Sequence, residues 1–170
     1  QLITAKPVIY VCNVEEDSAA GGNSLSEKVA EKTALEGAQA VIISARIEEE
    51  LAQLDDGERL EYLDTLGLAD PGLNRLIRQG YDLLELITYF TAGPKEARAW
   101  TIRRGTPASQ AAGVIHTDFE RGFIRAETIG YDDYTELNGD QGARDAGRLR
   151  QEGKDYVVQD GDVMLFRFNV

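Results

Sequence analysis

The sequence is short of several features that mark particular classes of protein. Its 170 residues include one cysteine, Cys12, so no disulfide can form within the chain. A reducing compartment, most simply the cytoplasm, fits such a sequence. The apolar runs at 8–12 and 40–43 fall far short of the roughly 20 residues that a membrane-spanning helix needs. No signal peptide is visible either, and we therefore expect a cytoplasmic protein without a membrane partner.

A phosphate-binding loop is also missing, because no segment fits the pattern G-x-x-x-x-G-K-[ST]. Gln1 is not a usual initiating residue, and an apolar strand pattern follows almost at once. We therefore expect the chain to begin inside a domain of a longer protein.

Basic residues are few relative to acidic ones, and the formal net charge is -12. The imbalance lies mainly in residues 1–85, which carry 17 acidic and 7 basic side chains, against 13 and 11 in residues 86–170. Because a strongly acidic field repels phosphate backbones, we expect neither nonspecific nucleic-acid binding by the whole chain nor sequence-specific DNA binding. A local basic patch in the second half remains open.

The first half predicts part of a parallel α/β sheet. Residues 7–12 and 40–43 are apolar runs typical of buried strands. The helix between them is expected to open at Ser24, in a capping box with Glu27, and to close at Gly37. A strand, a helix and a strand in this order form a βαβ unit with a right-handed crossover.

Helices are expected next at 47–54 and 57–66, followed by one with Asp70 as its N-cap and Pro71 at its first position. This last helix carries an apolar stripe, which we expect to close a first domain of residues 1–84. The stripe consists of Leu73, Leu76, Ile77, Tyr81 and Leu84.

The second half predicts a compact α+β domain of the β-grasp kind over residues 85–168. Its expected strands are 86–92, 98–103, 123–128 and 163–168, and its expected helices are 107–114 and 142–151.

Two polar segments follow the two predicted parallel strands, at the sheet edge where ligands bind in open α/β sheets. P-loop GTPases place Asn-Lys-x-Asp after the first strand to read guanine, and Ser-Ala-Lys or Ser-Ala-Leu after the second. Here Val14 stands in place of the lysine and Glu16 in place of the aspartate. An asparagine amide can instead pair with N6 and N7 of adenine. The predicted base-binding residues are Asn13, Val14, Glu16, Ser44, Ala45 and Arg46. The alternative is a solvated acidic loop.

Longer segments carry a more specific resemblance. They are 73–75 (LNR), 80–81 (GY), 88–93 (TYFTAG), 98–101 (RAWT), 111–113 (AAG), 116–126 (HTDFERGFIRA), 153–156 (GKDY), 160–163 (DGDV) and 168–170 (FNV). Together they resemble YchF-type Obg-like ATPases, which are P-loop NTPases of the Obg-related group. Another branch of Obg-related GTPases also carries a TGS domain but is expected to keep Asn-Lys-x-Asp, so Val14 and Glu16 favour the ATPase branch.

The resemblance implies binding and hydrolysis of ATP with some use of GTP, dependence on Mg²⁺, a coiled-coil insertion and ribosome association. It implies that residues 1–84 are the C-terminal part of a nucleotide-binding domain and that residues 85–168 are a β-grasp (ubiquitin-like) TGS domain. The phosphate loop, switch segments and Mg²⁺ ligands would then lie upstream. Because phosphoryl transfer depends on those parts, we predict no catalytic or metal-binding residue here and an inactive isolated chain.

The arginines of the second half are candidates for partner binding. If their strands are neighbours, they could form one face that binds rRNA phosphates or an acidic regulatory protein. The residues are Arg98, Arg103, Arg104, Arg121 and Arg125. The alternative is dispersed surface charge. Two functions stay open at this point: the C-terminal half of a ribosome-associated ATPase, and a non-catalytic TGS module that binds a protein or RNA.

Overall fold

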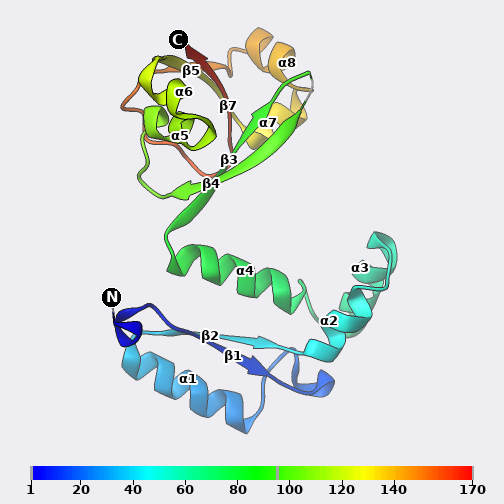
Figure 1. Cartoon of the computed structure of the whole chain (residues 1–170). Helices are drawn as coiled ribbons and strands as arrows, with labels where there is room; N and C mark the ends of the chain where they lie inside the picture. Colours follow the sequence, from blue (N-terminus) through cyan, green and yellow to red (C-terminus); the bar gives the residue numbers. More distant parts are fainter. Residues whose placement is uncertain (1, 95, 170) are drawn as a thin grey trace. The chain divides into compact units, whose positions relative to one another are not determined.

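The computed structural model describes residues 2–94 and 96–169. The chain forms two compact units, residues 1–84 and 85–170 (Figure 1). The first contains a two-stranded sheet and the second a five-stranded sheet. No helix within the described residues is long and apolar enough to cross a bilayer. The predicted mixture of α/β and α+β structure is confirmed at this level.

The first unit is built on a short parallel sheet. β1 (Ile9–Asn13) pairs with β2 (Gln39–Ile43), and Asn13 lies opposite Ile43 at the carboxyl ends. α1 (Ser24–Glu36) connects the strands and packs on one face of the sheet, while α4 (Gly72–Leu83) covers the other (Figure 1). The βαβ unit is therefore present as predicted.

The start of α1 differs from the prediction by one residue. Its N-cap is Asn23, whose Oδ1 accepts hydrogen bonds from the backbone N–H groups of Leu25 and Ser26, each at 3.0 Å. Ser26 completes the capping box, so the predicted Ser24–Glu27 box is wrong. Asparagine is among the strongest N-cap residues, because its short side chain reaches the free N–H groups of the first turn.

The remaining elements of this unit are short helices. They are the 3₁₀ turns η1 (Ile3–Ala5) and η2 (Glu16–Ser18) and the helices α2 (Ala45–Leu51) and α3 (Asp56–Thr65). The buried apolar cluster of the unit joins these helices and their loops and takes no residue from the sheet. Its members are Ala19, Ile47, Leu51, Leu63 and Leu68.

The predicted N-cap of α4 is wrong, while its apolar stripe is present and partly exposed. The helix begins at Gly72 with Pro71 at the N-cap, so Asp70 does not cap it. Much of its apolar stripe is not buried, since Leu73, Ile77 and Leu84 are each about half exposed. The helix packs on the sheet through other residues: a Cβ on Gly72 would come within 3.0 Å of Ile43, and Arg75 donates a hydrogen bond to the carbonyl of Ile42.

The second unit has a mixed sheet in the order β4-β3-β7-β5-β6. β3 and β4 form an antiparallel hairpin, β3 and β7 are parallel, and β5 runs antiparallel to both β7 and β6. The strands are β3 (Leu86–Ala92), β4 (Ala97–Arg103), β5 (Phe123–Gly130), β6 (Arg150–Glu152) and β7 (Asp162–Phe168).

Helices lie on both sides of this sheet (Figure 1). α5 (Ala108–Ile115) and α6 (Thr117–Arg121) cover the main core, and α7 (Tyr131–Glu136) and α8 (Asp140–Asp145) lie on the other side. Tyr89 is fully buried, with its hydroxyl donating to the carbonyl of Ala111 at 2.9 Å and its ring edge-on to Phe166.

The predicted helix over residues 142–151 is wrong in its second half. α8 ends at Asp145, Gly147 has a left-handed φ of 69°, and β6 follows at Arg150. A left-handed glycine stops a helix readily, and pairing with β5 then fixes the next residues as a strand. Tertiary pairing therefore overrides the helix propensity of the Ala- and Arg-rich segment.

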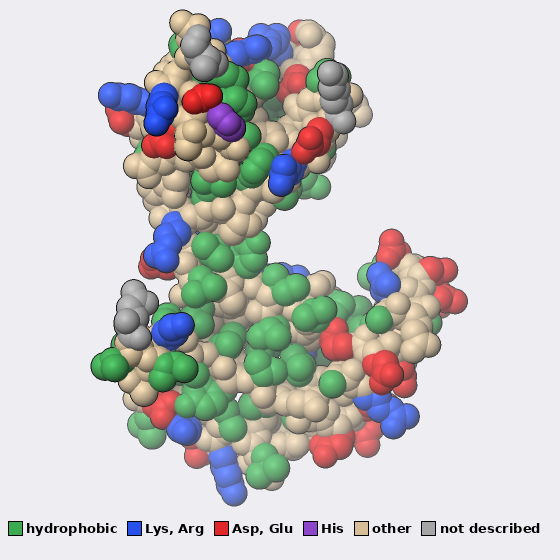
Figure 2. Space-filling model, in the orientation of Figure 1, with side chains coloured by type: hydrophobic (Ala, Val, Ile, Leu, Met, Phe, Trp, Pro, Cys, Tyr) green, Lys and Arg blue, Asp and Glu red, His purple; other side chains and the backbone are tan. Residues whose placement is uncertain are grey.

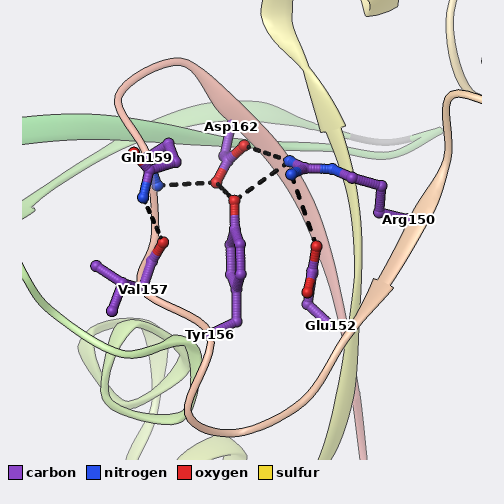
Figure 3. Close-up of polar contacts among 6 residues, drawn as sticks. All are labelled: Arg150, Glu152, Tyr156, Val157, Gln159 and Asp162. Carbon is purple, nitrogen blue, oxygen red and sulfur yellow. Dashed lines mark hydrogen bonds and ion pairs between the residues drawn. The ribbon is translucent and has the colours of Figure 1, made fainter.

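The loop between β6 and β7 is held by a buried carboxylate (Figure 3). Asp162 accepts hydrogen bonds from the hydroxyl of Tyr156 at 2.8 Å, the backbone N–H of Gln159 at 2.9 Å and the guanidinium of Arg150 at 3.1 Å. Burial, together with the hydrogen bond to Asp162, raises the pKa of Tyr156 to about 12. Because each group has its partners, we interpret this network as structural.

Candidate functional site

The structure brings the two predicted base-binding segments into direct contact. Oδ1 of Asn13 accepts a hydrogen bond from the backbone N–H of Ala45 at 2.9 Å, and the N–H of Val14 donates to the carbonyl of Ile43 at 2.9 Å. The Asn13 side chain therefore ties the loop after β1 to the start of α2. Its amide nitrogen donates to no other described residue and stays free for a ligand.

A charged pair lies beside this contact. Nε of Arg46 is 2.6 Å from Oε1 of Glu16 and 3.7 Å from Oε1 of Glu50. Tyr62 in turn donates a hydrogen bond to Glu50, and this bond raises the pKa of the Tyr62 hydroxyl to about 12. The two loops thus present a carboxylate and a guanidinium side by side, which gives both an acceptor and donors to a polar ligand edge.

The other two predicted residues lie beneath the surface. Val14 and Ser44 are both buried, and the hydroxyl of Ser44 has no hydrogen-bond partner among the described residues. Most buried polar groups are paired, so the Ser44 hydroxyl is an exception that stands directly before Ala45. Of the other four predicted residues, Asn13, Ala45 and Arg46 are exposed and Glu16 is half-buried.

The surroundings of these two loops are acidic (Figure 2). No group of three or more His, Cys, Asp or Glu residues that could hold a metal ion occurs within residues 2–94 and 96–169. Acidic side chains gather over α2 and α3 (Figure 2), which makes the surroundings unfavourable for phosphate. The arrangement offers hydrogen-bond donors and acceptors to a polar ligand, with Arg46 as its exposed cationic group.

The structure does not bring the predicted arginines onto neighbouring strands. β4 carries Arg98 and Arg103 at one edge of the sheet, while Arg125 lies on β5, and both β3 and β7 run between these strands. Arg98 stacks over the ring of Trp100 with 4.2 Å between the guanidinium carbon and the ring centre. Because the strands that carry these arginines are not neighbours, the strand order does not support a single arginine face. Arg104 directly follows β4, and Arg121 ends α6.

Two arginines that were not among the predicted partner-binding residues lie beside Arg125. Arg144 on α8 and Arg167 on β7 converge with it on the carboxylate of Glu127. The alternation Arg125-x-Glu127 indicates part of this cluster, because it places both side chains on one face of the strand. The contribution of Arg144 and Arg167 depends on tertiary pairing, which local spacing does not reveal.

Comparison with known proteins gives several consistent matches. The family profile YchF-GTPase_C, described as "Protein of unknown function (DUF933)", matches residues 86–169. The chain is 58% identical over 168 residues to the ribosome-binding ATPase YchF of Haemophilus influenzae, a match that covers 99% of the chain and 46% of the relative. It is 52% identical to the protein of the same name in Bacillus subtilis, with 99% and 47% covered. Obg-like ATPase 1 of Rattus norvegicus is 42% identical, with 99% and 43% covered.

Solved structures give matches of the same extent. The YchF GTPase of Schizosaccharomyces pombe aligns with a TM-score of 0.84 and 38% identity, covering 98% of this chain and 44% of that one. A GTP-binding protein from Pyrococcus horikoshii OT3 aligns with a TM-score of 0.65 at 19% identity, which shows a shared fold alone. The chain spans about half the length of the curated relatives that it matches.

Proposed function

Since the chain belongs to the YchF family of Obg-like ATPases and matches the C-terminal part of its members, we propose that it acts as the C-terminal half of an ATP-binding, ATP-hydrolysing protein that associates with ribosomes. The observation that carries this proposal is the match over 99% of the chain to relatives named ribosome-binding ATPase. Such a protein would work in the cytoplasm, with the ribosome as its main partner and regulatory proteins as further ones.

In this proposal, residues 1–84 are the C-terminal part of a nucleotide-binding domain and recognise the base. The free amide nitrogen of Asn13 donates to N7 of adenine, and Glu16 accepts from the N6 amino group. Guanine has a carbonyl oxygen in place of that amino group, and a carboxylate repels it. The contacts between Asn13 and Ala45 and between Glu16 and Arg46 support this reading, because they hold the loops in one place. Phosphates and Mg²⁺ would be bound by other segments of the longer protein.

Residues 85–168 are proposed to be a β-grasp TGS domain that docks onto the ribosome. The sheet order supports this assignment: numbered within the unit, it reads 2-1-5-3-4, with the first and last strands parallel in the centre. The described residues of the unit carry neither a metal-ligand cluster nor a recognisable nucleophile motif. A docking role is therefore favoured over catalysis, and the isolated chain is expected to hydrolyse no ATP.

The base-recognition part is tested in a protein of the relatives' full length. Val14→Lys combined with Glu16→Asp restores the guanine-reading pattern, in which the shorter carboxylate accepts from N1–H and the 2-amino group of guanine instead of meeting its 6-oxygen. The difference between the binding free energies of ATP and GTP should then shift toward GTP by about 1–3 kcal/mol. Calorimetry with both nucleotides measures this difference. Glu15→Asp is a matched control, because the neighbouring Glu15 is exposed and outside the proposed contacts. An unchanged difference in the double variant would refute this role for the loop.

The docking part is tested by charge reversal in the same full-length protein. Arg98→Glu, Arg104→Glu and Arg125→Glu together reverse charge at separate places on the second unit, since β3 and β7 lie between the strands of Arg98 and Arg125. Because binding through arginine is electrostatic, the triple variant should weaken cosedimentation with ribosomes across a salt series. It should leave the ATPase rate nearly intact. Unchanged cosedimentation would place the docking surface elsewhere.

A further inference from the structure

Glu127 is a buried acid in the second unit that is surrounded by positive charge. It lies on β5 with 7% of its surface exposed. Arg167 donates to both of its oxygens, at 3.2 and 3.3 Å, and Arg144 donates to Oε2 at 3.4 Å. A nitrogen of Arg125 lies 3.8 Å from Oε1. The hydrogen bond from Arg167 lowers the pKa of Glu127, so the carboxylate is ionised near neutral pH.

The three arginines share this one carboxylate. Within the described residues, none of them forms an ion pair with any other acid. Their side chains are 46%, 53% and 49% exposed in the order Arg125, Arg144 and Arg167. Each guanidinium has five N–H donors, and Glu127 takes only a few of them. The cluster therefore presents excess positive charge and uncommitted donors to solvent.

The strand register adds an independent observation. Arg125 of β5 lies directly opposite Arg167 of β7 in the antiparallel pair. Like charges at directly opposed positions destabilise a sheet, and Glu127 offsets only part of that repulsion. Sequence features that oppose local stability are expected at functional sites.

A small hollow lies next to the cluster. It has a volume of about 200 Å³, and its wall includes Glu127, Arg144 and Arg167 together with Asp140 and Leu149. The charged residues of its wall are balanced, with Arg144 and Arg167 against Glu127 and Asp140. Arg125 does not line the hollow, and it supplies the excess positive charge from its position beside Glu127. The hollow can take a group of phosphate size against the guanidinium edges.

We propose that Arg125, Arg144 and Arg167 bind a phosphate of an RNA backbone, with Glu127 as the internal counter-ion that orients them. Planar guanidinium groups donate paired hydrogen bonds to phosphate oxygens, and a second anion between Arg125 and Arg167 removes their mutual repulsion. The choice of RNA as the source of the phosphate rests on the proposed ribosome association, while the anion site itself rests on the geometry alone.

The test uses the full chain and a short, labelled single-stranded RNA oligonucleotide, with binding followed by fluorescence anisotropy across a salt series. Arg144→Gln and Arg125→Gln should each weaken binding several-fold and lower the slope of log K against log salt by about 0.7, the value for one lost phosphate contact. Arg148→Gln is the matched control, since Arg148 lies in the same unit and pairs with its own acid, Asp133. Arg144→Lys should restore part of the affinity.

Two results would overturn the proposal. If both variants bind the oligonucleotide as Arg148→Gln does, the arginines serve only to neutralise Glu127. If inorganic phosphate at matched ionic strength shifts the NMR signals of the cluster while the oligonucleotide does not distinguish the variants, the site takes a small phosphate and not RNA. Ribosome cosedimentation of the full-length protein is a separate readout: if it persists while oligonucleotide binding fails, the proposed function stands and this inference does not.

Discussion

The two units bury their apolar residues to different degrees. The second unit encloses a core between a five-stranded sheet and two helices, with Tyr89 and Met164 almost fully buried. The buried cluster of the first unit lies among short helices and includes no strand residue. Ten of the fifteen large apolar side chains that are exposed among the described residues lie in the first unit. Since buried apolar area is the main source of stability, the second unit should be the more stable of the two.

The difference in burial predicts that the two units unfold separately. A two-stranded sheet is marginal by itself, so β2 should open with a free energy lower than that of β3 by roughly 2 kcal/mol or more. Hydrogen exchange measured by mass spectrometry on the chain compares residues 39–43 with residues 86–92. A single cooperative transition, with equal protection in both segments, would show that the difference in burial has no energetic consequence.

The core of the second unit can be tested at Tyr89. Tyr89→Ala should cost about 3–5 kcal/mol, because it leaves a large cavity in a packed core. Tyr89→Phe is the matched control and should cost about 1 kcal/mol, since it removes only the hydrogen bond to the carbonyl of Ala111. Denaturant unfolding of the second unit measures both values. Equal effects of the two substitutions would mean that the ring contributes little.

The sequence predicted the second unit's paired strands better than its helices. β3 has the predicted bounds, and β4, β5 and β7 differ by one or two residues, because alternation and turn residues mark strands locally. The segment after Gly147 was mistaken for helix, since only pairing with β5 makes β6 a strand. The apolar stripe of α4 correctly predicted that this segment is a helix. It did not predict which face of the helix packs on the sheet, because that contact depends on the small size of Gly72.

The candidate sites show the same limit. Family resemblance and strand ends selected the loops at Asn13 and Ser44, and the structure places these loops in contact. The packing of the loops determines two features that the sequence does not show. The side-chain oxygen of Asn13 accepts a hydrogen bond from Ala45, and Val14 is buried. The convergence of Arg144 and Arg167 on Glu127 joins residues 17 and 40 positions away in sequence, which local spacing cannot reveal. The base-contact roles remain predictions.

A medium effect is expected at Glu127. Glu127→Gln should destabilise the second unit by about 1–3 kcal/mol, because three arginines lose their shared counter-ion. Since the pKa of Glu127 is lowered in the folded state, its contribution is present above the ordinary glutamate pKa of about 4.3 and is lost as the pH falls through the lowered value. The unfolding free energies of the variant and the parent chain should therefore differ at neutral pH and converge at acidic pH. Glu136→Gln, at an exposed position on α7, should change the free energy at neither pH.

The smallest effect on stability is expected at Glu16 in the first unit. Its partner Arg46 is 74% exposed and Glu16 is 35% exposed, so solvent screens their ion pair. Exposed pairs contribute about 0–1 kcal/mol, and Glu16→Gln should shift the unfolding free energy of the chain by no more than that. Glu49→Gln is the control, since Glu49 is exposed on α2, the helix that carries Arg46, and forms no ion pair within the described residues. In the full-length protein, the same Glu16→Gln substitution should weaken ATP binding several-fold, because the proposed acceptor for the adenine amino group loses its charge. A loss of stability well above that of Glu49→Gln would make Glu16 a structural residue, and weaker ATP binding would then no longer be evidence for base recognition.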